Sequence, residues 1–491
     1  MDIQTLLSKF EQKQIKSVMR ETLGFDTPEQ FQSTLLREVV VSTLFGSSIT
    51  LGSGLSMIPD QALHNFHYMG RTQIGKSKAI EFQARQRVDQ NQGFMLIDPK
   101  GPLFRDVLRY CVKRNQRKIL IIDANPGRSH YLSFNPLKPD PGETIERCAA
   151  RVVDAILSAY GETIKDHNYL RVYLKEMFYC LIFNQLTLKE ARYFLLEAFE
   201  EQRNVILERT RINGRKPYAV EVLEDLYGRP KWSHDIEPKL LSIINRLGVV
   251  GSESLGNILN EGDHSISIRE AVEQGYVILV NVSPGDSGNR EYLTILGALI
   301  LNSVFAANPK EKFDCYIDEV GFFATTLLKE VLHLGLGKKI VLHLAHQYKD
   351  QLKNNDMFKA VSNGCANKIC FQLPDAADVA DISRSLFGTS NDALTNLLLS
   401  LEKQWAIAKV QGEDDPRHIQ IPTVPDVEIS DAEVDEYLNS LYVEHNHYRT
   451  REQRQQAEAE RLSAFLKVPI KESTRAPRPA KQPLKQHKLD L

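Results

Sequence analysis

Short apolar runs alternate with helical patterns over two stretches of this chain. Each run is bounded by polar or glycine-containing segments, and a helical spacing of apolar residues follows most of them. Such alternation predicts parallel strands that are covered by helices, and therefore an α/β fold with a parallel-rich sheet. The runs are Asn65–Met69, Gly93–Ile97, Ile119–Ile122, Tyr276–Val282, Phe313–Ile317, Lys339–Leu344, Lys368–Leu373 and Gln404–Val410.

The alternation stops between the two stretches. Long helical patterns take its place at Glu143–Tyr160, Asn168–Phe183 and Leu188–Arg209. Apolar residues at helical spacing without intervening strands indicate an all-α unit. We therefore predict an all-α domain at residues 141–251, inserted into an α/β domain that is formed by residues 63–140 and 252–425.

The two ends of the chain have their own patterns. Residues 1–62 predict an N-terminal helical accessory segment, and residues 426–466 predict a C-terminal helical segment with a helix from Asp431 to about Phe465. Residues 467–491 hold seven Lys or Arg, two acidic residues and four prolines. This composition predicts a disordered basic tail, with a solvated spacer and a DNA or partner contact as equal alternatives.

Composition narrows the class of protein. Of the 491 residues, 42% are hydrophobic and 25% are charged, which is the balance of a folded water-soluble protein. The net charge of −2 gives no bulk positive field, so any nucleic-acid contact is expected to be local. Six cysteines without a CxxC pair predict reduced thiols.

The N-terminal sequence predicts a cytoplasmic location. The first residues show no basic and apolar pattern of a signal peptide. The uncharged stretch Val39–Ile58 contains many Ser, Thr and Gly residues, which makes it a poor membrane span. We expect no direct membrane span, and association with the inner membrane only through a partner.

The segment Gly70-Arg71-Thr72-Gln73-Ile74-Gly75-Lys76-Ser77 has the GxxxxGK[ST] spacing of a Walker A loop. It follows the strand-like run that ends at Met69 and precedes a helical pattern. Backbone N–H groups of such a loop surround phosphates, the lysine neutralises the β- and γ-phosphate oxygens, and the hydroxyl binds Mg²⁺. The sequence therefore predicts a site for ATP and Mg²⁺, with Lys76 catalytic and Ser77 a metal ligand.

Hydrolysis needs further groups beyond the phosphate loop. Asp318 and Glu319 follow the apolar run Phe313–Ile317, where Asp318 is expected to hold Mg²⁺ and Glu319 to activate the attacking water. Gln347 follows another run and can both donate and accept hydrogen bonds, so it is a candidate sensor of the γ-phosphate or the water. Together these residues predict an ATPase.

Taken in order, these motifs resemble the HerA/FtsK superfamily, and most closely the TraG/TraD-type coupling proteins of type IV secretion. The resemblance spans about Leu63 to Pro425. It is carried by the Walker segments, and also by Gly93-Phe-Met-Leu-Ile-Asp98-Pro-Lys100-Gly101, Ser133-Phe-Asn-Pro-Leu137, Gly275-Tyr-Val-Ile-Leu-Val-Asn281, Leu344-Ala-His-Gln347 and Lys368-Ile-Cys-Phe-Gln-Leu373.

The resemblance implies a RecA-like P-loop NTPase core that forms a homo-hexamer around DNA, with a relaxase or a secretion-channel component as partner. It assigns Asp98 and Lys100 no step in the chemistry, and a structural turn after a strand is the alternative for them. Two positions depart from the family pattern: Gln73 stands where many relatives have Gly, and Leu336 stands where many relatives carry an arginine finger. Candidates for a replacement cation are Lys338, Lys339, Arg246 and Arg384.

The leading interpretation is an ATP-dependent DNA translocase that serves conjugative or mobile-element DNA transfer. One alternative is a HerA-like helicase or translocase in DNA processing or defence. Another is a nucleotide-gated adaptor ring with little turnover, which the leucine at position 336 keeps open. Ring size, DNA polarity and pore-lining residues cannot be deduced from the sequence.

Overall fold

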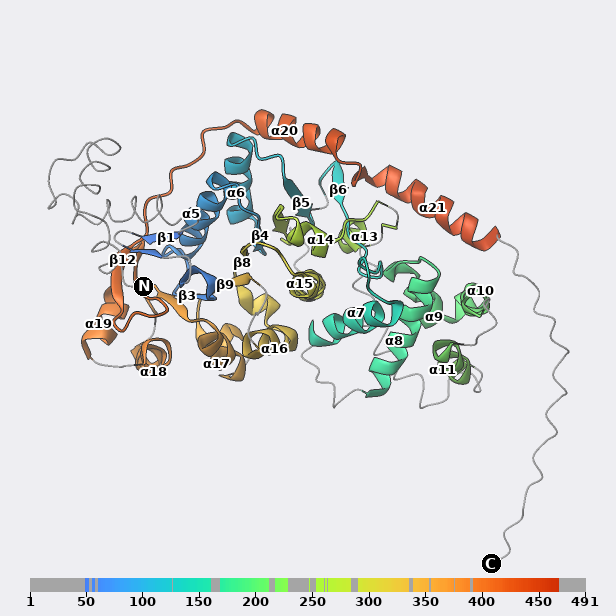
Figure 1. Ribbon diagram of the computed structural model, residues 1–491, viewed down its shortest axis with the longest axis horizontal. Coiled ribbons are helices and arrows are strands. Elements are labelled where there is room, and N and C mark those ends of the chain that lie inside the picture. Colours follow the sequence, from blue (N-terminus) through green and yellow to red (C-terminus); the bar gives the residue numbers. More distant parts are fainter. Residues whose placement is uncertain are drawn as a thin grey trace, which may run out of the picture.

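A nine-stranded, mostly parallel sheet forms the centre of the molecule (Figure 1). Its strand order is β12-β11-β10-β3-β9-β8-β4-β7-β5, in which the seven strands from β10 to β5 run parallel and β11 pairs antiparallel with both β10 and β12. The computed structural model describes residues 49–52, 55–57, 61–125, 127–159, 168–211, 217–227, 247, 253–259, 261–262, 264–283, 290–334, 339–352, 355–374, 376–388 and 392–467.

The apolar runs of the sequence form the strands of this sheet. Each predicted run overlaps a strand, and the ends of run and strand differ by three residues or fewer. The parallel strands are buried on both faces, which explains why they read as continuous apolar runs. They are β3 (Phe66–Met69), β4 (Phe94–Asp98), β5 (Ile119–Asp123), β7 (Val277–Asn281), β8 (Phe313–Ile317), β9 (Ile340–His346) and β10 (Asn367–Cys370), and the two remaining strands are β11 (Trp405–Lys409) and β12 (Arg417–Gln420). The α/β class with a parallel-rich sheet is thus confirmed.

Helices cover both faces of the sheet (Figure 1). Side chains of β4 alternate between the two cores: Phe94 and Leu96 face one, whereas Met95 and Ile97 face the other. The first core includes α5 (Lys76–Asp89) and α6 (Pro102–Lys113). The second core includes α15 (Arg290–Ala306), α16 (Thr326–Leu334), α17 (Asn355–Gly364), α18 (Ala376–Phe387) and α19 (Asp392–Ser400).

A group of helices lies between β5 and β7 in the chain. It begins with α7 (Ile145–Ala159) and α8 (Asn168–Phe183) and includes α10 (Glu200–Thr210), α11 (Tyr218–Tyr227) and α13 (Glu253–Leu259), after which α14 (Ile268–Glu273) leads into β7. The single helix predicted over Leu188–Arg209 is wrong. Leu196 takes an extended conformation there, so the segment divides into η2 (Leu188–Ala191), α9 (Arg192–Leu195), η3 (Glu197–Phe199) and α10.

The N-terminal accessory segment is not helical throughout. The strands β1 (Ile49–Gly52) and β2 (Leu55–Met57) pair antiparallel as a hairpin, whereas residues 1–48, 53–54 and 58–60 lie outside the described part. Ile49, Leu51, Leu55 and Met57 are buried with the α5 side of the sheet, and a period of two is the spacing of a strand. Sequence reasoning missed this hairpin because serines and glycines diluted the pattern.

The predicted helix from Asp431 to about Phe465 is interrupted. It comprises α20 (Asp431–Glu444), the strand β13 (Tyr448–Thr450) and α21 (Arg451–Lys467). β13 pairs with β6 (His130–Leu132), and the backbone N–H of Ile121 on the edge strand β5 donates to the Tyr448 hydroxyl at 2.9 Å. These long-range partners override the local helical pattern. Residues 468–491, which hold all but the first residue of the predicted basic tail, lie outside the described part.

Two smaller expectations concern the membrane and the cysteines. Within the described ranges, no helix is long and apolar enough to cross a bilayer. All six cysteines are buried and free, which agrees with the prediction of reduced thiols.

Candidate nucleotide site

The loop from Gly70 to Ser77 connects β3 to α5 at the carboxyl end of the parallel strands. Gly70 has φ +154°, and a Cβ atom at this position would lie 2.6 Å from Cβ of Phe371. Gly75 has φ +131° and forms the N-cap of α5. Both positions therefore require glycine. The unpaired backbone N–H groups at the start of α5 can bind an anion such as a phosphate group.

Two segments that are distant in the sequence form backbone hydrogen bonds with this loop. The backbone N–H of Arg71 donates to the carbonyl of Gln372 at 3.0 Å, and the N–H of Gln404 donates to the carbonyl of Ile74 at 2.7 Å. Gln372 follows β10, the neighbour of β3, and Gln404 precedes β11, the next strand beyond β10, so segments at the ends of these two strands fix the loop's shape. Sequence reasoning missed both residues, because they act through their backbones and leave no mark in the sequence.

Lys76 is buried at the centre of the loop. Its Nζ donates to the carbonyl of Gly70 at 2.6 Å and to that of Arg71 at 2.9 Å. Burial lowers the pKa of Lys76, and the carboxylates of Asp318 and Glu319 counteract this shift. The amine of Lys76 therefore faces the backbone carbonyls of the loop. It also feels the negative charges of Asp318 and Glu319, which follow β8.

The predicted magnesium ligands meet across the site. The Ser77 hydroxyl donates to Oδ2 of Asp318 at 2.9 Å. Asp318 is buried, and its burial together with the charges of Glu319 and Asp98 raises its pKa to about 6. No cluster of three or more His, Cys, Asp or Glu gathers in the part of the chain that the structure describes. Mg²⁺ fits such a site, because it takes few protein oxygens and completes its shell with water and phosphate.

Glu319 stands at the end of β8 in a left-handed conformation with φ +50°. Three side chains donate to its carboxylate: Lys100 Nζ at 2.5 Å and Gln347 Nε2 at 2.5 Å to Oε1, and Gln351 Nε2 at 2.9 Å to Oε2. Burial alone would raise the pKa of Glu319, but these hydrogen bonds outweigh it and lower the pKa. The carboxylate is therefore held as an anion in one orientation.

Gln347 links Glu319 to the phosphate loop. Its Oε1 accepts a hydrogen bond from the Thr72 hydroxyl at 2.8 Å, while its Nε2 donates to Glu319. The backbone N–H of Gln347 donates to Oε1 of Gln351 at 2.6 Å. The structure thus brings together the candidate sensor and the candidate base, and adds Gln351, which sequence reasoning did not select as a site residue.

Asp98 and Lys100 gain structural roles that the sequence could not assign. The two carboxylate oxygens of Asp98 accept hydrogen bonds from the backbone N–H groups of Lys100 at 2.8 Å and Phe104 at 2.9 Å. Asp98 thereby fixes the turn between β4 and α6, and this turn directs the Lys100 side chain toward Glu319. The signal in the sequence was the Asp-Pro-Lys-Gly turn after β4, but only the sheet order shows that β4 lies beside β8, which Asp318 and Glu319 follow.

Comparison with solved structures shows similar folds. The coupling protein TrwB in complex with ADP and Mg²⁺ is 14% identical, with a TM-score of 0.59 over 80% of this chain and 94% of that chain. VirB4 of Thermoanaerobacter pseudethanolicus is 13% identical, with a TM-score of 0.53 over 77% of this chain and 97% of that chain. The chain has the fold of a conjugative coupling protein. No protein-family model and no curated protein matches the sequence.

This coupling-protein fold places two buried histidines behind the site. His67 on β3 and His346 on β9 lie with their Nε2 atoms 2.6 Å apart, and Nδ1 of His346 lies 3.1 Å from the carbonyl of Tyr348. The carbonyl can only accept, so His346 carries its hydrogen on Nδ1 and accepts from Nε2–H of His67. Burial lowers the pKa of both, that of His346 to about 4.

The candidate replacement cations are only partly described. Leu336, Lys338 and Arg246 lie outside the described residues. Lys339 donates to the carbonyl of Lys310 at 2.5 Å at the start of β9, which is the end of the strand away from Gln347. Arg384 is exposed on α18. A trans-acting cation therefore stays unassigned.

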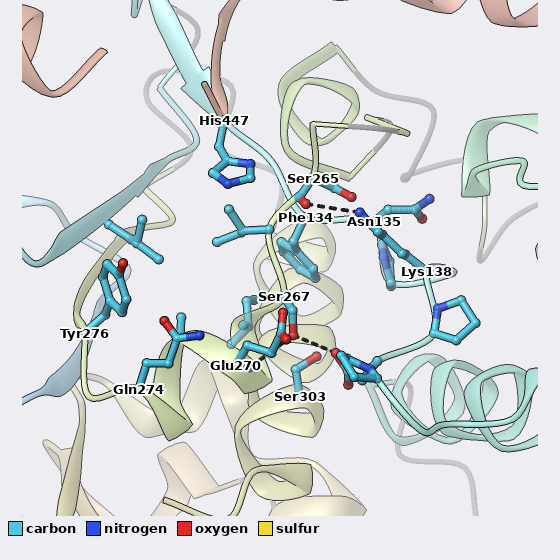
Figure 2. A pocket seen from close by; sticks show the side chains of 18 of the residues that line it. Phe134, Asn135, Lys138, Ser265, Ser267, Glu270, Gln274, Tyr276, Ser303 and His447 are labelled. Atoms are coloured by element: carbon cyan, nitrogen blue, oxygen red, sulfur yellow. Dashed lines mark hydrogen bonds between the residues drawn. The ribbon is translucent and has the colours of Figure 1, made fainter. Parts of the chain in front are cut away.

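A second cavity lies beside β5, away from the phosphate loop, and has a volume of about 460 Å³ (Figure 2). Two of its lining residues are Phe134 and Asn135, which belong to the Ser133–Leu137 segment of the family resemblance. The opposite wall includes Glu270 of α14 and Gln274, the residue that follows this helix. Ser267 donates to Oδ1 of Asp140 at 2.7 Å. None of the predicted nucleotide-site residues is among its described lining residues.

Proposed function

We propose that this chain is an ATP-dependent DNA translocase, a coupling-protein-like motor for conjugative or mobile-element DNA transfer. The observation that carries the proposal is the 2.9 Å contact between Ser77 of the phosphate loop and Asp318 at the end of β8, with Glu319 next in the chain. A hydroxyl and a carboxylate in contact beside a phosphate loop are the protein ligands of a magnesium nucleotide. The TrwB structures, solved with ADP and Mg²⁺ and with an ATP analogue, support this choice of ligand.

The proposed roles follow from the geometry. Backbone N–H groups of Gly70–Ser77 surround the phosphates, and Lys76 neutralises the β- and γ-phosphate oxygens. Ser77 and Asp318 hold Mg²⁺, which when bound neutralises charge between the two phosphates. Glu319 takes a proton from the water whose oxygen attacks the γ-phosphorus. The bond from that phosphorus to the bridging oxygen breaks, ADP leaves, and Gln347 orients the water.

The proposed assembly is a homo-hexamer around DNA. We assign residues 63–140 and 252–425 to the motor, residues 141–251 to the inserted helical domain, and the remaining segments to accessory roles. A relaxase or a secretion-channel component would be the partner, with the ring on the cytoplasmic side of the channel. The fold that this chain shares with TrwB and VirB4 supports this assignment.

Two other functions use the same site differently. A HerA-like helicase or translocase would act in DNA processing, and a nuclease as pull-down partner would favour it over secretion. A nucleotide-gated adaptor ring would bind ATP and turn it over little. The leucine at position 336, where many relatives carry an arginine finger, supports the adaptor, because loss of such a finger costs about 10³-fold or more in rate.

The test is DNA-stimulated ATP hydrolysis by the full chain, compared with Lys76→Ala and Glu319→Gln. We expect DNA to raise turnover of the wild type, and both variants to lose it by about 10²-fold or more. Glu319→Gln should still bind ATP, whereas Lys76→Ala should bind it weakly. Equal turnover in wild type and variants would refute the motor. Tight ATP binding without turnover, even with DNA and partner, would favour the adaptor.

A further inference from the structure

The carboxylate of Glu319 is held by three donors, and only one of these donors is charged. Gln347 and Gln351 donate as amides, whereas Lys100 forms an ion pair at 2.5 Å. Oε1 of Glu319 accepts hydrogen bonds from both Lys100 and Gln347, so both of its lone-pair directions are occupied. For Glu319 to accept a proton from water, at least one donor must give way.

Of the three donors, Lys100 is the one whose side chain can most readily change its partner. Its backbone N–H is anchored by Asp98, but its side chain is 46% exposed, in contrast to the buried Lys76. A lysine side chain has four rotatable carbons and a point charge, so it can change partners without a change in the backbone.

We propose that Lys100 is a γ-phosphate-responsive cation supplied within the same chain: it pairs with Glu319 and transfers to the γ-phosphate oxygens of bound ATP. This inference rests on the proposed ATPase function. The transfer places a positive charge on the γ-phosphate and releases Oε1 of Glu319 toward the attacking water. ADP lacks the γ-phosphate and leaves the ion pair intact.

The charge balance favours this exchange of partners. The γ-phosphate of ATP presents more negative charge than the single charge of Glu319, and its three oxygens offer Lys100 more acceptors. Leu336 at the usual arginine-finger position cannot supply this charge from a neighbouring subunit. Lys100 therefore responds to the presence of the γ-phosphate and stabilises the negative charge that develops on it. Before ATP binds, it positions Glu319.

The test compares nucleotide affinities of the full chain carrying Lys100→Met, Lys100→Gln or Lys100→Arg. With Mg²⁺ present, the Kd values for ADP and for a non-hydrolysable ATP analogue are measured separately. We expect Lys100→Met and Lys100→Gln to weaken analogue binding about 10-fold and to leave ADP binding within about 2-fold. Lys100→Arg should restore analogue binding. The control is Lys113→Met, at the exposed last turn of α6, which should change neither value.

Other outcomes would overturn the inference. Equal losses for ADP and the analogue would mean that Lys100 only supports the shape of the phosphate loop. Unchanged affinities in all variants with wild-type turnover would mean that it plays no part. A wild type that binds neither nucleotide would refute the proposed function. A wild type that binds both without turnover would refute hydrolysis alone, and the affinity comparison would still decide the role of Lys100.

Discussion

Ser77 at the start of α5 and Asp318 at the end of β8 are 241 positions apart in the chain, and the Ser77 hydroxyl donates to Oδ2 of Asp318 at 2.9 Å. β3, β9 and β8 are neighbours in the sheet, so the loop after β3 and the residues after β8 reach the same edge. The helices from α7 to α14 separate the phosphate loop from β8 in the sequence, but they add no strand to the sheet between β3 and β8.

Replacing Ser77 with Ala should remove one protein ligand of Mg²⁺ without altering the phosphate loop. We expect Mg²⁺ to increase the affinity of the wild type for an ATP analogue. In Ser77→Ala, the factor by which Mg²⁺ increases this affinity should be about 10-fold smaller. The measurement is a nucleotide titration with Mg²⁺ or with EDTA. Equal metal dependence in both proteins would exclude Ser77 as a ligand, and the EDTA values show whether the loop itself is intact.

Gln73 occupies a left-handed position, with φ +59°, at which many relatives have glycine. A residue with a Cβ atom costs about 1 kcal/mol there, and a β-branched residue costs more. We expect Gln73→Val to lower the free energy of unfolding by about 1–2 kcal/mol, and Gln73→Ala to leave it nearly unchanged. Denaturant unfolding measures both. A valine variant as stable as the alanine variant would mean that the loop does not keep this conformation.

Arg87 on α5 is fully buried, and its Nε lies 2.8 Å from Oδ2 of Asp314 on β8. Arg87, Lys312 and His343 surround this carboxylate, and they lower its pKa although burial opposes the shift. Arg87→Met leaves the buried anion short of one partner, so we expect a loss of about 3–5 kcal/mol in the free energy of unfolding.

The exposed ion pair between Arg114 and Asp89 provides the matched control for Arg87. Arg114→Met should lower the free energy of unfolding far less than Arg87→Met does, because exposed ion pairs contribute little. Thermal or denaturant unfolding measures both variants. If the two costs were similar, the buried network around Asp314 would not stabilise the fold as described.

The buried pair His67–His346 predicts a stability that depends on pH. Burial lowers the pKa of His346 to about 4, below the value of about 6.5 for an unfolded histidine. Between these values the unfolded chain binds a proton that the folded chain does not, so stability falls as the pH falls through this window. From pH 7 to pH 5 we expect this histidine to contribute a loss of about 2 kcal/mol.

His346→Asn should make this pH dependence shallower, whatever its effect on stability at pH 7. The exposed His447 provides a control, since His447→Asn should leave the slope unchanged. Unfolding free energies measured at several pH values between 5 and 7 give the slopes. A slope in His346→Asn that equals the wild-type slope would contradict the assignment of His346 as buried and neutral.

The sequence alone predicted the fold class and the positions of the main strands, because parallel strands buried on both faces are continuous apolar runs. It failed at Leu188–Arg209 and Asp431–Phe465. An extended residue at Leu196 and the pairing of β13 with β6 decided those segments, and neither is encoded in a local period. The hairpin at residues 49–57 was missed for the same reason.

For the site, the sequence by itself selected the phosphate loop with Asp318, Glu319 and Gln347, because each of these roles demands a particular residue type after a strand. Only the tertiary structure showed that Lys100 and Gln351 hold Glu319, and that backbone groups of Gln372 and Gln404 support the loop. The physical reason is the strand order: it places β4 beside β8, and β10 beside β3, and such neighbours cannot be deduced from spacing along the chain.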